Sequence, residues 1–206
     1  MALVKLNNRG VRSATAFGSI TGLGSMTFIK KVTASSSATV SFVDGTSDVV
    51  LDNTYKEYLF TFNNIHPATD GAKLSVNFSI DSGSNYNVTK TTTFFRTSHY
   101  EDDSDATLGY RTGQDLAQST GEQELTDSVG NDNDQSTSGY LHLFDPSNTI
   151  FVKHFIATTN ASHGINISQN HFIAGYGNTT SAIDGVRFKF SSGNIDAGDI
   201  CLYGIN

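Results

Sequence analysis

Hydrophobic and polar residues alternate with a period of two along most of the chain after Ser25. That spacing is typical of β-strands that bury one face and expose the other. The clearest segment is 74–80, where Leu74, Val76 and Phe78 alternate with polar residues. Similar alternation, or a run rich in Thr and aromatic residues, predicts further strands at 28–32, 40–42, 58–62, 87–98, 140–144, 150–158, 171–176, 186–191 and 200–205.

These nine or ten short strands are separated by turns rich in Gly and Ser, and no segment has the pattern of a long helix. The pattern predicts an all-β fold, and the expected architecture is an antiparallel, jelly-roll-like β-sandwich. With 206 residues, 37% of them hydrophobic, the chain is long enough for one such domain with a core. No apolar run approaches the roughly 18 residues of a membrane span, so no membrane partner is expected.

The predicted strand 150–158 differs from the others because both of its faces are apolar. Ile150 and Ile156 share one face with His154, while Phe151 and Phe155 point the other way. A strand of this kind is expected to be buried on both sides or to lie at a contact between subunits.

The first 24 residues lack regular alternation, and several glycines interrupt their apolar positions. They are expected to form an extended N-terminal arm that lies against another surface, because no helix in this segment would be stable alone. The predicted organisation is therefore an arm at 1–24 and a β-sandwich domain at 25–206. The arm residues expected to anchor it are apolar or basic: Leu3, Lys5, Leu6, Arg9, Arg12 and Phe17.

Residues 99–138 interrupt the strand pattern, since they are acidic, rich in Gly and Ser, and poor in β-branched apolar residues. The segments 113–117 and 123–127 are the candidates for a short helix. A stretch of about 40 residues with little regular structure is uncommon in a compact domain. We therefore expect a large acidic surface excursion, or a segment ordered by a neighbouring chain.

The charge is distributed unevenly along a chain whose formal net charge is −7. Residues 1–43 contain five basic residues and no acid, whereas residues 101–134 contain ten acids against one Arg. One interpretation is a solvated acidic loop and a basic tail without a special role. The other is that the basic start docks on an acidic surface of another subunit or another protein. The overall negative charge argues against a nucleic-acid partner.

The sequence carries no motif of a common catalytic site. There is no G-x-S-x-G, no P-loop and no G-x-G-x-x-G between a strand and a helix, so neither an enzyme nor a cofactor is expected. The single cysteine, Cys201, lies in an apolar strand and is expected to be a buried structural thiol. The N-terminus lacks the continuous apolar core of a signal peptide, which indicates synthesis in the cytoplasm.

Two kinds of metal site stay open as alternatives, although no metal is the main expectation. His142 and His154 could approach each other on neighbouring strands. The acidic runs 101–105 and 131–136 suggest Ca²⁺, but the second lacks the Gly and the Glu that an EF-hand loop requires. Only an irregular Ca²⁺ site is compatible with these residues.

Several stretches resemble small structural proteins, of fibre or decoration type, from the virions of tailed phages, especially marine phages. They are LVKLNNRGVRSATAFGSI at 3–20, YKEYLFTFNNIHPATD at 55–70, DSGSNYN at 81–87 and SGNIDAGDICLYGI at 192–205. The ending resembles the last strand of many β-sandwich proteins on phage heads and tails. The resemblance implies a non-enzymatic virion component that assembles as a homo-oligomer, usually a trimer, beside other capsid or tail proteins.

Three hypotheses for function follow. The first is a structural phage protein, assembled in the host cytoplasm and attached to the virion by its arm, as a surface fibre or a capsid decoration. The second is a tail-fibre module that binds a host receptor or a surface glycan, with the acidic segment 99–138 as the contact. The third is a polysaccharide-degrading enzyme, which needs a pair of carboxylates; the 20 acids allow many pairs, and the four Glu have no distinctive setting.

Overall fold

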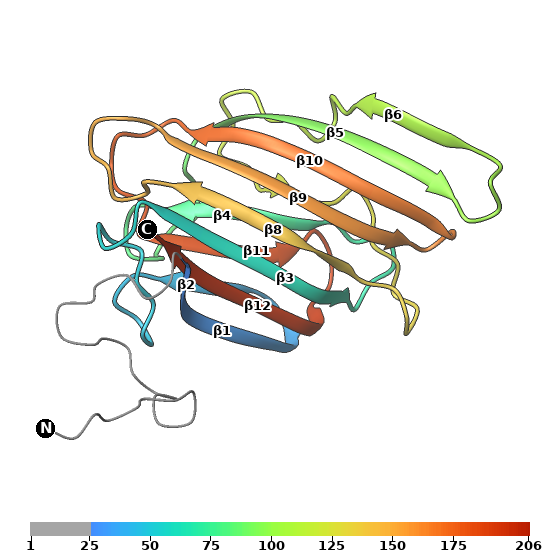
Figure 1. Ribbon diagram of the computed structural model, residues 1–206, viewed down its shortest axis with the longest axis horizontal. Coiled ribbons are helices and arrows are strands. Elements are labelled where there is room, and N and C mark those ends of the chain that lie inside the picture. Colours follow the sequence, from blue (N-terminus) through green and yellow to red (C-terminus); the bar gives the residue numbers. More distant parts are fainter. Residues whose placement is uncertain (1–25) are drawn as a thin grey trace, which may run out of the picture.

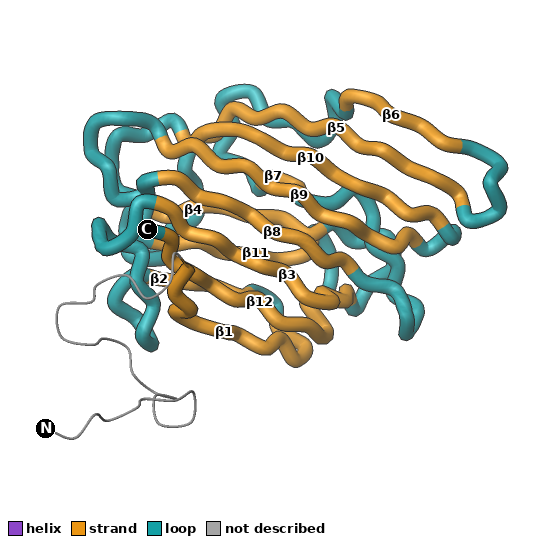
Figure 2. The backbone as a smooth tube through the Cα atoms, in the orientation of Figure 1, coloured by secondary structure: helices purple, strands orange, loops and turns teal. Residues whose placement is uncertain are grey.

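The computed structural model of the protein describes residues 26–206, which form twelve β-strands (Figure 1). This part of the chain contains no helix, and so no helix with the length and hydropathy that crossing a membrane would require (Figure 2). The strands are β1 (Met26–Ser37), β2 (Val40–Val43), β3 (Glu57–Pro67), β4 (Leu74–Ser79), β5 (Lys90–Tyr100), β6 (Ala106–Tyr110), β7 (Gln123–Glu124), β8 (Thr137–Phe144), β9 (Lys153–His163), β10 (Ile167–Gly177), β11 (Gly185–Phe190) and β12 (Ile195–Ile205).

The strands belong to two antiparallel sheets that pack face to face. The large sheet has 8 strands in the order β1-β12-β3-β8-β9-β10-β5-β6, and the small sheet has 4 in the order β2-β11-β4-β7. In the view of Figure 1 the large sheet lies in front of the small one.

Four strand pairs reveal the topology: β1 with β12, β2 with β11, β3 with β8, and β4 with β7. Together they make one long antiparallel ribbon, and rolling this ribbon on itself places β1-β12-β3-β8 opposite β2-β11-β4-β7. That strand order is the order of a jelly roll. The predicted antiparallel jelly-roll-like β-sandwich is therefore confirmed.

Two pairs of strands are added to the jelly roll, and both extend the large sheet. β9 and β10 are inserted between β8 and β11, while β5 and β6 are inserted between β4 and β7. The additions join because β10 pairs with β5. The large sheet consequently continues beyond the edge of the small sheet (Figure 1).

The core between the sheets is made of the inward-pointing residues of the alternating segments. Phe188 of β11 lies at its centre, with its ring centroid 5.1 Å from Phe62, 5.4 Å from Phe60 and 6.4 Å from Phe42. All three contacts are edge-to-face, which is a favoured geometry for aromatic pairs. These rings fix the distance and the alignment of the two sheets.

The acidic segment 99–138 is a surface excursion only in part. Its first portion completes β5 and forms the exposed strand β6. Its second portion forms β7 and fully buries Leu125 and Val129. Neither 113–117 nor 123–127 is helical, because the segment pairs with strands instead: the backbone N–H of Leu125 donates to the carbonyl oxygen of Leu74 (2.6 Å).

The predicted strand 150–158 begins later than expected, at Lys153, and it is not buried on both sides. Ile150 and Phe151 lie in the preceding loop and are 72% and 67% exposed. Within β9, Phe155 points into the core, whereas Ile156 points outward and is 48% exposed. The small sheet covers only one side of this strand, which leaves its second apolar face open.

Candidate functional site: the outer face of the large sheet

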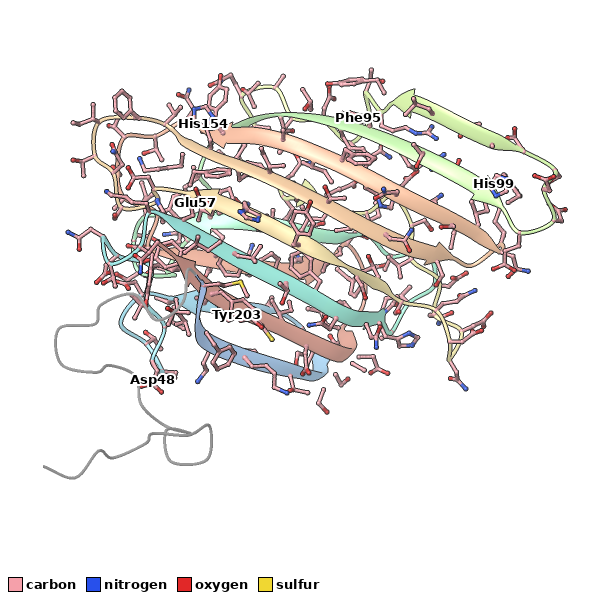
Figure 3. All side chains as sticks on the ribbon, in the orientation of Figure 1. Asp48, Glu57, Phe95, His99, His154 and Tyr203 are labelled. Carbon is pink, nitrogen blue, oxygen red and sulfur yellow. The ribbon has the colours of Figure 1, made fainter. Side chains whose placement is uncertain are left out.

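The large sheet has an inner side, which packs on the small sheet and the core, and an outer side, which nothing in residues 26–206 covers. We call the outward-pointing side chains of this sheet the outer face. Figure 3 shows five of them, Tyr203, Glu57, His154, Phe95 and His99, spread across the sheet that lies in front. Seven of the eleven exposed large hydrophobic residues in this part of the chain belong to it: Met26, Phe28, Phe95, Leu108, Tyr110, Tyr140 and Ile156.

The outer face is almost free of charge. On β8, β9, β10, β5 and β6 no outward-pointing residue is Asp, Glu, Lys or Arg. Charges occur only toward the other end of the sheet, where Lys31 pairs with Asp199 (3.2 Å) and Glu57 approaches His142 (3.8 Å). The chain has a net charge of −7, so this absence of charged side chains distinguishes the outer face of these five strands from the rest of the surface.

Strand register arranges the outward side chains in continuous rows across the sheet. One row pairs Tyr140, Thr158, Phe172, Phe95 and Tyr110 on five successive strands. Within it, the rings of Phe95 and Phe172 stack with centroids 5.2 Å apart. Such cross-strand pairs hold the rings in fixed positions, so the face presents preorganised aromatic rings among uncharged polar side chains such as Asn160, Asn170 and Thr97.

A shallow groove of about 450 Å³ runs along the outer face between β9, β10 and β5. It exists because Ala174, which is small, stands between the larger Ile156 and Thr93. His154 and Tyr176, whose rings meet edge-on with centroids 6.0 Å apart, line one end. The groove gives an otherwise flat surface a recess that a protruding apolar side chain can fill.

The residues singled out from the sequence fall in different places. The anchoring residues Leu3, Lys5, Leu6, Arg9, Arg12 and Phe17 lie outside the described residues. Cys201 is only 6% exposed. His142 and His154 lie on adjacent strands of the outer face, offset by two residues in register, since His142 is opposite Ile156. Within 26–206, no three His, Cys, Asp or Glu side chains gather closely enough to hold a metal ion.

A cluster of polar residues lies on the inner side of the added strands β9, β10, β5 and β6. The sequence pattern did not predict it. Arg96 of β5 forms an ion pair with Asp127, which also accepts a hydrogen bond from Gln114 (3.0 Å). His171 of β10 is completely buried beside them, and burial lowers its pKa to about 4. Its Nε2 accepts a hydrogen bond from the backbone N–H of Asp127 (3.1 Å), and its Nδ1 lies 3.1 Å from Oγ1 of Thr159.

Comparison with known proteins adds no assignment, since no protein-family model, no curated protein and no solved structure matches the chain. The functional argument therefore starts from the geometry of the outer face and of the polar group beneath the added strands.

Proposed function

We propose that the protein is a non-enzymatic structural subunit of a phage virion, which associates with copies of itself through the outer face and is attached to the particle by residues 1–24. The observation that carries the proposal is the aromatic, charge-free surface on five adjacent strands. Aromatic enrichment with depletion of charge is typical of the buried centre of a protein–protein interface. The phage character of the assembly rests on the resemblance of the four stretches described above.

The charge distribution favours a second copy of the chain as the occupant of the face. Two molecules that each carry a net charge of −7 repel each other over most of their surfaces. They can approach without placing carboxylates opposite one another where both surfaces lack them, and the added strands offer such a surface. An acidic chain therefore associates with itself most favourably through this face.

The size of the face is also adequate for a stable contact. With strands about 4.8 Å apart, all eight strands span roughly 34 Å and four outward residues along each strand add roughly 20 Å; the five charge-free strands supply somewhat more than half of this area. The whole outer face is therefore close to the roughly 800 Å² per partner of a standard interface, with the charge-free strands as its larger part and the end with the Lys31–Asp199 pair as the remainder. A closed ring of copies, such as the trimer that the resemblance implies, would use this surface in each protomer.

Self-association can be tested by placing a carboxylate in the middle of the face. We expect Ile156→Asp to weaken association at least tenfold, because each copy then buries a charge in the contact. The measurement is sedimentation equilibrium of the full chain over a wide concentration range. Ile165→Asp is the matched control, since Ile165 is also exposed (60%) but lies in the turn between β9 and β10.

Wild-type protein that stays monomeric at every concentration would contradict self-association. Equal behaviour of Ile156→Asp and Ile165→Asp would place the contact elsewhere on the molecule.

The attachment role of residues 1–24 is tested by deleting them. We expect the truncated chain to keep its thermal unfolding transition and to be absent from purified virus particles. The physical reason is that burial of Leu3, Leu6 and Phe17 against a neighbour is worth roughly 1.5–3 kcal/mol for each fully buried side chain, before entropy is subtracted. Incorporation of the truncated chain at the wild-type level would exclude an anchoring role for this segment.

A further inference from the structure

A small pocket lies on the inner side of the added strands, across the sheet from the outer face. It is an open cleft of about 300 Å³, lined by residues of β5 and β6 and of the segments beside β6, and by Ile167 of β10. Arg96 and its register partner Gly109 both belong to this side of the sheet. Because Gly109 has no side chain, it leaves space opposite Arg96: a Cβ atom at Gly109 would meet no other heavy atom within 4 Å.

Two arginines converge on this pocket. Arg111 follows β6 and continues its pairing with β5, since its backbone N–H donates to the carbonyl oxygen of Phe94 (2.9 Å). Its side chain therefore lies on the same side as Arg96, one diagonal step along the ladder. Both arginines line the pocket. The β5–β6 register thus brings together two cations that are well separated in the sequence.

The hydrogen bonding of these arginines is incomplete. The Nε atoms of Arg96 and Arg111 are both buried and have no hydrogen-bond partner. Arg96 has an ion pair with Asp127, whereas Arg111 has none within 4.0 Å among residues 26–206. The Nε atoms themselves are out of reach of solvent and of a ligand, so the donors that an acceptor in the pocket could satisfy are the terminal guanidinium nitrogens, above all those of Arg111, which has no ion pair.

Apart from the carboxylate of Asp105, the rest of the lining is neutral and suited to hydroxyl groups. The hydroxyl oxygens of Ser98 and Thr107 lie 2.6 Å apart, and either can donate or accept. Tyr100 adds an aromatic ring and Ile167 an apolar wall. One carboxylate, that of Asp105, also belongs to the lining, on an exposed residue.

We propose that this pocket binds an acidic sugar, a monosaccharide unit that carries a carboxylate. Arg111 and Arg96 donate to the carboxylate, because guanidinium groups match its planar, two-oxygen geometry. Ser98 and Thr107 contact the sugar hydroxyls, and the pocket is at the small end of the range for ligand sites, which fits one sugar ring. The site is distinct from the centre of the outer face, because Arg96, Ser98 and Thr107 point to the other side of the sheet and only Leu108, on the edge strand β6, belongs to both surfaces.

The test is titration calorimetry of the full chain with glucuronate, with glucose as the neutral counterpart and sulfate as an inorganic anion. We expect glucuronate to bind and glucose not to bind. Arg111→Gln should weaken glucuronate binding about tenfold or more, because a charge-assisted hydrogen bond is lost. Gly109→Val should abolish binding by filling the pocket. Lys189→Gln on β11 is the control that removes a cation from the small sheet, and it should leave binding unchanged.

Thermal unfolding of each variant checks that it folds, and Gly109→Val is expected to fold because its side chain enters open space. Failure of glucuronate to bind the wild-type chain would overturn the proposal, as would binding that both pocket variants leave unchanged. Displacement of glucuronate by an equal concentration of sulfate would show a site that selects charge alone, and this result would overturn the assignment to a sugar.

Discussion

Phe188→Ala is expected to lower the free energy of unfolding by about 3–5 kcal/mol, the range for removing a phenylalanine from a packed core. Phe188 is completely buried, and its ring meets those of Phe42, Phe60 and Phe62 edge-on. Truncation removes all three contacts at once and leaves a cavity between the two sheets. The rigid strands around it can close this cavity only in part.

The measurement is equilibrium unfolding in urea, followed by near-UV circular dichroism, for wild type and variant at one protein concentration. Phe151→Ala is the matched control, because Phe151 is 67% exposed in the loop before β9 and its loss should change stability by no more than about 0.5 kcal/mol. A loss below 1 kcal/mol for Phe188→Ala would mean that this ring does not hold the sheets together.

The alternation that places Phe188 in the core could be read from the sequence, but the partners of its strand could not. Val186, Phe188 and Phe190 alternate with Arg187 and Lys189, and β11 covers nearly the predicted range. Periodicity identifies which face of a strand is buried and carries no information about its neighbours. β1 and β12, which pair along most of their length, stand at opposite ends of the described chain.

The segment 99–138 was harder to predict because its buried residues are few and irregularly spaced. Gln123 is completely buried although it is polar, since its amide oxygen accepts a hydrogen bond from the hydroxyl of Thr92 (2.5 Å). Thr126 is buried in the same way, accepting from the backbone N–H of Leu74 (2.8 Å). A segment held by polar contacts with distant strands resembles a loop when only its hydrophobic pattern is considered.

The two candidate sites also differ in how far the sequence could predict them. A signal for the outer face was present, since residues 137–178 contain only one acid, Asp145, and one base, Lys153. The sequence did not show that the charge-poor strands lie side by side, because this arrangement depends on the insertion of β9 and β10 and on the pairing of β10 with β5. The arginine pocket had no signal, because only the β5–β6 register brings Arg96 and Arg111 together.

The second large effect is expected from acidification and comes from His171. Burial among β-strands keeps this imidazole neutral, and its pKa of about 4 contrasts with the ordinary value of 6.5. Arg111 lowers this pKa further, whereas the charge of Asp127 opposes the shift. The hydrogen-bond pattern agrees with a neutral ring: Nε2 accepts from the Asp127 backbone, and Nδ1 can donate to Thr159.

Between pH 6.5 and 4 the unfolded chain therefore binds a proton at His171 that the folded chain does not bind. Stability should fall as the pH is lowered through this window, by about 3 kcal/mol in total, and become independent of His171 below pH 4. Glu124 has the opposite sign, because burial raises its pKa and protonation then favours the folded state. For this reason the difference between wild type and variant is more informative than either curve alone.

The experiment compares urea unfolding at several pH values for wild type, His171→Asn and His163→Asn. His171→Asn is expected to be less stable at pH 7 and to lose about 3 kcal/mol less than wild type on acidification from pH 6.5 to 4. His163→Asn is the control that removes an imidazole from the partly buried last residue of β9, away from the polar group around His171. Parallel curves for wild type and His171→Asn would show that His171 binds a proton equally in the folded and the unfolded chain. That result would contradict the assignment of His171 as a neutral, buried imidazole beneath the added strands.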